Sequence, residues 1–136
     1  MKRVNGFLAA QIMAVVTLTA LAACGGGDSP TGPGTGGGSP GPSGATVTIA
    51  NGRVSPTSVT IAVGQSVTFV NNDGRGHNIS SDPHPVHTDC PQINAVSNLA
   101  VGQSRLTNAF PSARSCGFHD HDDPENANLK GTINIQ

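Results

Sequence analysis

Hydrophobic and polar residues alternate in short runs over the C-terminal two thirds of the chain. The runs with this strand-like alternation are 46–49, 58–63 and 66–70. A turn and strand are expected at 102–107, followed by Phe110 and a segment at 114–116, and a last strand is expected at 131–136. Turn-forming pairs such as Asn51-Gly52 and Gly64-Gln65 separate them. No window has a persuasive helical period. The pattern predicts an all-β domain, an antiparallel sandwich or barrel of about seven or eight strands.

Residues 1–23 have the pattern of a bacterial lipoprotein signal peptide. Lys2 and Arg3 precede an apolar run that is too short for a confident membrane span. The segment 21–24, Leu-Ala-Ala-Cys, resembles a lipobox, in which Cys24 becomes the lipidated N-terminus. The alternative is an ordinary cleavage site with an incidental cysteine. The first reading predicts secretion across the inner membrane and a lipid-anchored protein in the periplasm, at the outer membrane or at the cell surface. Gly25 after the cysteine resembles signals for the outer membrane or cell surface.

Residues 24–44 contain almost nothing that a core could bury. Their glycine, proline, serine and threonine content predicts a disordered tether between Cys24 and a domain at 45–136. Once the signal peptide is removed with Lys2 and Arg3, acidic residues outnumber basic ones. No basic patch is visible, so the composition argues against nucleic-acid binding and leaves the lipid as the expected membrane contact.

All five histidines lie between positions 77 and 121, and two cysteines lie in the same interval. The histidines are His77, His84, His87, His119 and His121, and the cysteines are Cys90 and Cys116. Imidazole and thiolate are the ligands that bind copper or zinc. This concentration in a small domain predicts a metal site, and the domain is poor enough in aromatic residues to gain from a metal or a disulfide.

Two segments resemble the cupredoxins, the blue-copper proteins of the plastocyanin and azurin type. The segment 63–72 followed by His77-Asn78 is similar to the strand, turn and strand that lead to the first copper histidine. Near the C-terminus, Cys116 is followed by histidines, then by Leu129 and Gly131, in the order of that family's ligand loop. The resemblance covers 45–136 and implies a cupredoxin-like Greek-key β-sandwich that binds copper.

The same resemblance implies a ligand set and a function. His77 and one of His119 or His121 would supply nitrogen, and Cys116 a thiolate, in a site suited to one-electron transfer with a redox partner protein. Leu129 stands where the family has an axial methionine and cannot coordinate. The chain also departs from the family at 82–91, where His84, His87 and Cys90 predict a second or enlarged metal site.

The sequence leaves open whether Cys90 and Cys116 are free thiols or are bonded to each other. If Cys24 is lipidated, Cys90 and Cys116 are the remaining thiols, and in an oxidising compartment two such cysteines form a disulfide by default. A bridged Cys116 could not be a ligand. The domain would then be a histidine-rich copper carrier or chaperone that exchanges metal with a donor or acceptor.

An enzymatic alternative rests on the segment 117–121. Gly-Phe-His-Asp-His is similar to a motif of copper–zinc superoxide dismutase, although only one strand follows it here. A zinc-stabilised structural domain is a further alternative. The leading prediction is a redox protein rather than an enzyme.

Overall fold

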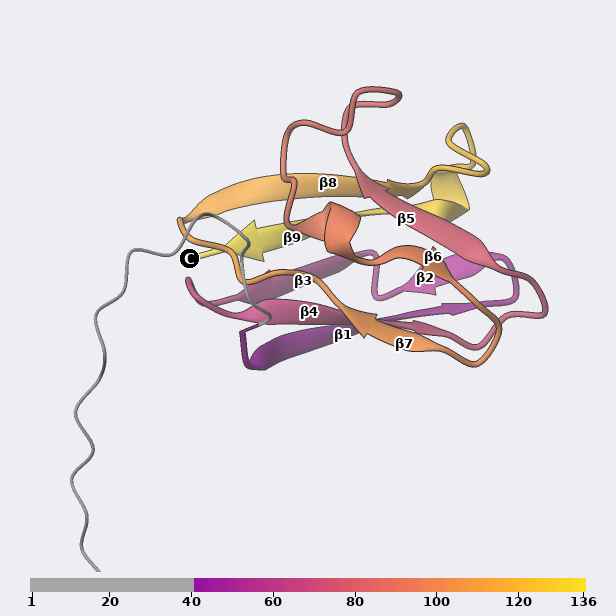
Figure 1. Cartoon of the computed structure of the whole chain (residues 1–136), viewed down its shortest axis with the longest axis horizontal. Helices are drawn as coiled ribbons and strands as arrows, with labels where there is room; N and C mark the ends of the chain where they lie inside the picture. The colour runs from indigo at the N-terminus through magenta and orange to yellow at the C-terminus, as the bar shows by residue number, and fades with distance from the viewer. Residues whose placement is uncertain (1–40) are drawn as a thin grey trace, which may run out of the picture. The chain divides into compact units, whose positions relative to one another are not determined.

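The computed structural model describes residues 41–136, which form nine strands and two short 3-10 helices (Figure 1). The strands are β1 Ser43–Ala50, β2 Arg53–Ser55, β3 Ser58–Ile61, β4 Ser66–Asn71, β5 His77–Ser81, β6 Ser97–Leu99, β7 Ser104–Leu106, β8 Arg114–Asp120 and β9 Lys130–Ile135. The 3-10 helices are η1 Ile93–Ala95 and η2 Ala127–Leu129. The all-β prediction is confirmed.

The strands form two sheets that pack face to face as a sandwich. One has the order β2-β1-β4-β7 and the other the order β3-β9-β8-β5-β6. Both sheets are mixed rather than wholly antiparallel as expected, because β1 pairs with β4 and β3 pairs with β9 in parallel. Parallel neighbours require a crossover connection, and here the intervening chain passes to the other sheet.

Three strands were not predicted from the sequence: β2, β5 and β6. Strands β2 and β6 have three residues each, too few for a periodic pattern to be recognised. Strand β5 has the sequence His-Asn-Ile-Ser-Ser, with a single β-branched apolar residue. Polar side chains occupy buried positions of β5, so a hydrophobic pattern does not reveal this strand. One of them is His77, a predicted ligand.

The core lies between the sheets and follows the alternation of each strand. On β3, Val59 and Ile61 are buried while Ser58 and Thr60 are exposed. The rings of Phe69 on β4 and Phe118 on β8 meet edge to face with centroids 5.0 Å apart and an interplanar angle of 86°. Such a pair adds about 1 kcal/mol to the burial of its apolar area. Phe118 therefore marks the inner face of β8.

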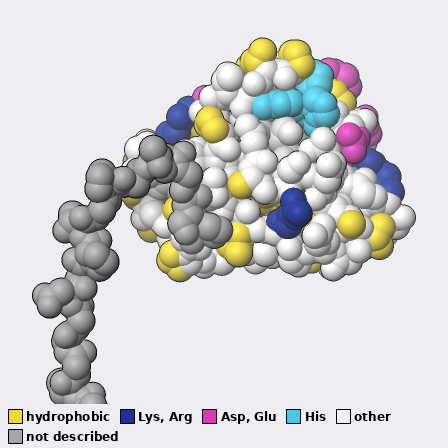
Figure 2. All heavy atoms as spheres, in the orientation of Figure 1, with side chains coloured by type: hydrophobic (Ala, Val, Ile, Leu, Met, Phe, Trp, Pro, Cys, Tyr) yellow, Lys and Arg dark blue, Asp and Glu magenta, His cyan; other side chains and the backbone are white. Residues whose placement is uncertain are grey.

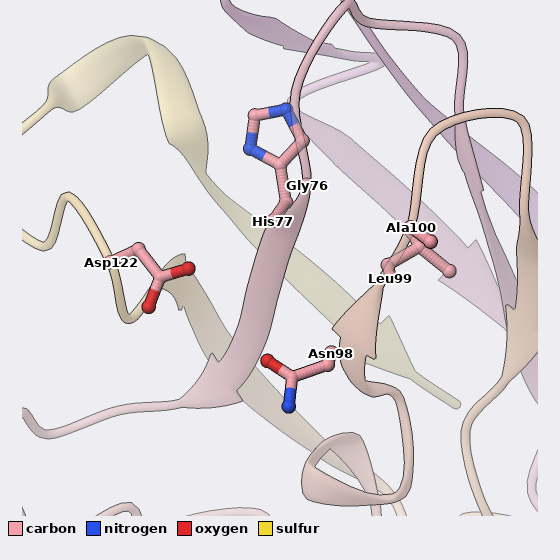
Figure 3. A pocket seen from close by; sticks show the side chains of 6 residues that line it. All are labelled: Gly76, His77, Asn98, Leu99, Ala100 and Asp122. Atoms are coloured by element: carbon pink, nitrogen blue, oxygen red, sulfur yellow. The ribbon is translucent and has the colours of Figure 1, made fainter.

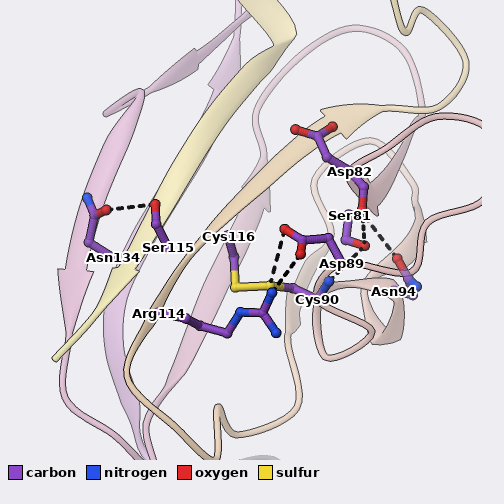
Figure 4. Close-up of a disulfide and its surroundings, with 9 residues drawn as sticks. All are labelled: Ser81, Asp82, Asp89, Cys90, Asn94, Arg114, Ser115, Cys116 and Asn134. Carbon is purple, nitrogen blue, oxygen red and sulfur yellow. Dashed lines mark hydrogen bonds and ion pairs between the residues drawn. A yellow bond between two sulfur atoms is a disulfide. The ribbon is translucent and has the colours of Figure 1, made fainter.

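A disulfide joins the segment after β5 to the inner face of β8. The sulfur atoms of Cys90 and Cys116 are bonded, and both residues are fully buried within the core (Figure 4). Beside it, the Arg114 guanidinium donates to Asp89 at 2.6 Å. The loop 82–89 between β5 and Cys90 is thus closed against β8.

The predicted domain boundary and the N-terminal segments fall mostly outside the described residues. Strand β1 begins at Ser43, slightly before the expected domain start at Ala45. The signal peptide, Cys24 and nearly all of the tether lie in residues that the structure does not describe. Within residues 41–136, no helix is long and apolar enough to cross a membrane.

Replacing both bridged cysteines by alanine should destabilise the domain by about 3 kcal/mol, because the cross-link closes a loop with a sequence separation of 26. Urea unfolding of the wild type and of the Cys90→Ala/Cys116→Ala variant would measure the difference. An unchanged free energy of unfolding would contradict the structural role given to the bridge.

Candidate metal centre

Four of the five histidines converge at one place on the surface. One ring nitrogen from each lies within 4.8 Å of one from every other, and the four are His84, His87, His119 and His121. Figure 2 shows histidine side chains gathered together on this face of the molecule. Two residues come from the loop after β5 and two from the end of β8, so the group joins segments that are distant in sequence.

The alternation of β8 decides which side chains join this group. Because Phe118 points into the core, Asp120 points inward too, and Gly117, His119 and His121 lie on the outer face. Pairing continues just past the end of β8, where the backbone N–H of His121 donates to the carbonyl of Asn78 at 2.6 Å. His119 and His121 therefore project from the same face of the five-stranded sheet.

The loop 82–89 is held in a defined shape that presents His84 and His87. The backbone N–H of His87 donates to the carbonyl of Pro83 at 2.8 Å, and the His87 carbonyl accepts from Asn94 Nδ2 at 2.9 Å. His87 has φ of 51°, a left-handed conformation that costs a non-glycine residue about 1 kcal/mol or more. Strain held in place by surrounding bonds is typical of functional positions.

His119 has the geometry of a metal ligand whose orientation is fixed. Its side chain is 1% exposed, and Nδ1 lies 2.7 Å from Asp82 Oδ1. An ionised carboxylate only accepts hydrogen bonds, so Nδ1 carries the proton and a neutral ring leaves Nε2 with a free lone pair. Among residues 41–136, this Nε2 is buried without a hydrogen-bond partner. A buried polar atom without a partner is costly, and a metal ion bound at Nε2 would remove the cost.

The other rings of the group match this interpretation. His121 Nδ1 and His87 Nε2 are 3.1 Å apart. Two nitrogens bound to one tetrahedral ion at about 2.0–2.1 Å would be roughly 3.3 Å apart. Burial, followed by the charges of His121, His119 and His84, lowers the pKa of His87. The ring therefore stays deprotonated, as a metal ligand must be, at a lower pH than an ordinary histidine.

The structure does not bring His77 into this group. His77 and Ile79 share the inner face of β5, and Ile79 pairs with the inward-facing Asp120, so His77 lies on the opposite face of the sheet from His119. Its Nδ1 is 2.8 Å from Asp120 Oδ2. Asp73 Oδ2 is 3.3 Å from Nε2, a close approach that does not have hydrogen-bond geometry. Two carboxylates thus occupy the surroundings of the expected first copper ligand.

Hydrogen bonds to its carboxylate favour the ionised form of Asp120, although the side chain is buried. Burial alone would raise its pKa, but the backbone N–H groups of Asn78 and Asp122 and the His77 ring all bond to its carboxylate and hold the pKa below its ordinary value. Arg75 Nη2 also donates to Asp120 at 3.1 Å.

An open pocket of about 190 Å³ lies beside His77, with Asn98 and Asp122 among its walls (Figure 3). None of the four grouped histidines lines it, so this pocket and the candidate metal centre are separate.

The prediction that Cys116 supplies a thiolate ligand is wrong. Cys116 is bonded to Cys90, so its sulfur is not a thiolate and cannot serve as the predicted copper ligand. Cys90 is excluded as a secondary candidate for the same reason. Cys116 also shares the inner face of β8 with Phe118, opposite to His119 and His121. Leu129 is fully buried in the core, in keeping with its expected inability to coordinate.

Asp82 is a residue of the site that the sequence pattern did not single out. The signal for the correct grouping was nevertheless present in the segment 116–121. If the strand continues through it, Cys116 and Phe118 share one face, and His119 and His121 share the other. The expected segment ends at Cys116, whereas β8 continues to Asp120 and gives residues 117–120 the alternation of a strand.

Comparison with solved structures shows a cupredoxin-like fold. The chain is 23% identical to a purple cupredoxin from Nitrosopumilus maritimus, with a TM-score of 0.55 over 68% of this chain and 99% of that one. It is 24% identical to the oxidised form of plastocyanin from Dryopteris crassirhizoma, with a TM-score of 0.52 over 67% of this chain and 99% of that one. It is 20% identical to amicyanin from Paracoccus versutus, with a TM-score of 0.54 over 68% of this chain and 81% of that one. No protein-family model and no curated protein matches the chain.

Asp120→Asn should make the unfolding free energy less sensitive to acid. Because the folded pKa of Asp120 lies below the value of about 3.9 expected in the unfolded chain, its ionised form stabilises the fold above that pH. The contribution is lost as the pH falls through the lower, folded pKa. Urea unfolding between neutral and acidic pH should therefore show a steeper loss for the wild type than for the variant, and parallel curves would contradict the assignment.

Proposed function

We propose that this domain binds copper through the imidazoles of His84, His87, His119 and His121, and that it carries the ion for exchange with a donor or acceptor protein. The observation that supports this most directly is the Nε2 of His119, which is buried without a partner among the described residues and belongs to one of the four convergent imidazoles. Copper is favoured over other metals by the likeness to cupredoxin structures, one of which is an amicyanin variant described with Cu(I).

The donor set favours the divalent ion. Imidazole is a borderline ligand that suits Cu(II) and Zn(II), whereas thiolate and thioether ligands select Cu(I). With Cys90 and Cys116 bonded to each other, the described residues of the group offer nitrogen alone. The bound ion would supply a Lewis-acidic or redox-active centre, and the four rings would hold it.

The four proposed ligands differ in solvent exposure, and this difference supports a function in carrying and exchanging metal. His119 is buried, His87 and His121 are intermediate, and His84 is exposed. An exposed ligand on a loop gives a partner's ligand access to the ion from one side, while the buried ring keeps the ion anchored. Metal exchange between proteins requires such an open side.

His119→Ala should lose most of its Cu(II) affinity, because the variant removes the most buried and best oriented ligand. His77→Gln is the matched control, since it changes a histidine on the opposite face of the same sheet, and it should keep wild-type affinity. Competition with a chelator would measure both. Copper binding that survives in the first variant and disappears in the second would refute the proposal and restore His77 as a ligand.

The spectrum of the copper-loaded chain gives a second measurement on the same sample. A site of imidazoles should be pale, without the intense thiolate-to-copper charge-transfer band that a His2Cys site would have. A strong visible band would refute the four-imidazole site.

One-electron transfer remains a second candidate function, favoured by the likeness to plastocyanin and amicyanin. The two candidates differ in what happens on reduction. A carrier that prefers the divalent ion should release copper when it is reduced, whereas an electron carrier should retain copper through repeated cycles. Voltammetry with analysis of released metal would distinguish them.

We further propose that the chain acts outside the inner membrane, attached by lipid at Cys24. The signal-like sequence and lipobox support this location, and so does the buried disulfide, because such bonds form in oxidising compartments. Cys24→Ala should abolish labelling by a radioactive fatty acid in a bacterial host. Labelling that persists in the variant would contradict the anchor.

A further inference from the structure

We infer that Asp82 is a positioning residue for the metal centre and that Gly117 is the residue that makes room for it. This inference rests on the proposed four-imidazole site and assigns a role to two residues outside the ligand set. Asp82 directly follows β5 and is the first residue of the loop 82–89, which bears His84 and His87. Among the described residues, it is the one carboxylate that bonds to a ring of the group.

Backbone pairing places Asp82 opposite Gly117. The pairing of Ser81 with Phe118 continues by one residue, because the N–H of Asp82 donates to the carbonyl of Gly117 at 3.1 Å. Cross-strand partners point to the same face, so the side chain of Asp82 stands on the outer face, where His119 also projects. From there Oδ1 reaches Nδ1 of His119 at 2.7 Å.

Gly117 leaves this space open. A Cβ atom at position 117 would collide with Oδ2 of Asp82 and would press on its Cγ at 3.0 Å. Gly117 lies within a strand and does not have a positive φ, so its backbone does not require glycine. The need for glycine is therefore steric, and the atom it accommodates is the carboxylate that orients His119.

The consequence for the metal centre is a fixed tautomer. With the Nδ1 proton held by Asp82, a neutral His119 keeps the Nε2 lone pair available to a metal ion, and the hydrogen bond restricts both the tautomer and the orientation of the ring. The main chain also links this arrangement to the loop, because the Asp82 carbonyl accepts from the N–H of Asp89 at 2.9 Å. Asp82 thus fixes both the buried ligand and the base of the loop that carries two others.

The test compares Asp82→Ala, Asp82→Asn and Gly117→Ala in the full chain, with Cu(II) as the probe. Loss of an outer carboxylate partner lowers metal affinity by about 10- to 100-fold. We expect a loss of this size for Asp82→Ala and Gly117→Ala, and a smaller loss for Asp82→Asn, whose amide oxygen can still accept from Nδ1. Asp89→Asn is the matched control, because it changes a carboxylate of the same loop that pairs with Arg114, and its affinity should equal the wild type.

A second readout distinguishes positioning from general destabilisation. Long-range nitrogen–proton NMR of the metal-free protein reports the tautomer of each histidine. His119 should be protonated on Nδ1 in the wild type and should become a mixture in Asp82→Ala, while urea unfolding confirms that the variant is folded. Wild-type affinity and an unchanged His119 tautomer in Asp82→Ala would overturn the inference.

A different result would refute the proposed function. If His119→Ala binds Cu(II) as tightly as the wild type, the four-imidazole site is refuted whatever the Asp82 variants do. If His119→Ala loses copper and Asp82→Ala does not, the site stands and the role given to Asp82 is refuted.

Discussion

The antiparallel pairing of β5 with β8 is the constraint on which both the core and the candidate metal centre depend. Its register places Ile79 opposite Asp120 and Ser80 opposite His119. Since side chains alternate along each strand, this register sends Phe118 and Asp120 inward and His119 outward. A shift of β8 by one residue would turn His119 to the inner face, turn Phe118 to the outer face and break the contact of Phe118 with Phe69. The energy of the core therefore fixes which polar side chains remain available for metal.

Each face of the sheet at this pairing has a histidine whose Nδ1 bonds to a carboxylate, but the surroundings of the two rings differ. On the inner face, His77 bonds through Nδ1 to Asp120, and a second carboxylate, that of Asp73, lies near Nε2. On the outer face, His119 bonds through Nδ1 to Asp82, and its ring lies in the group of four imidazoles. A carboxylate orients the ring in each case. What differs is the group beside Nε2, and neutral imidazoles leave a lone pair that can bind a cation.

The disulfide connects these observations to the proposed chemistry. It holds the loop after β5 against β8 from the inside, while Asp82 holds the start of the same loop from the outside. The bridge uses the sulfur that a blue-copper site would require, so the domain combines a cupredoxin-like fold with a group of imidazoles that could hold a metal ion through nitrogen. A cluster of imidazoles open on one side is better suited to holding and exchanging a divalent ion than to a thiolate-dependent colour or potential.

The sequence by itself determined the all-β class, the long alternating strands and the concentration of histidine and cysteine in one half of the domain. Those features follow from local patterns, because alternation and composition can be read within a few residues. Only the tertiary structure decided that Cys116 pairs with Cys90, that His77 lies on the opposite face from His119, and that Asp82 bonds to His119. Each of these depends on the register between β5 and β8. Strand β5 has too few apolar residues to reveal that register, so it was set by packing between segments far apart in the chain.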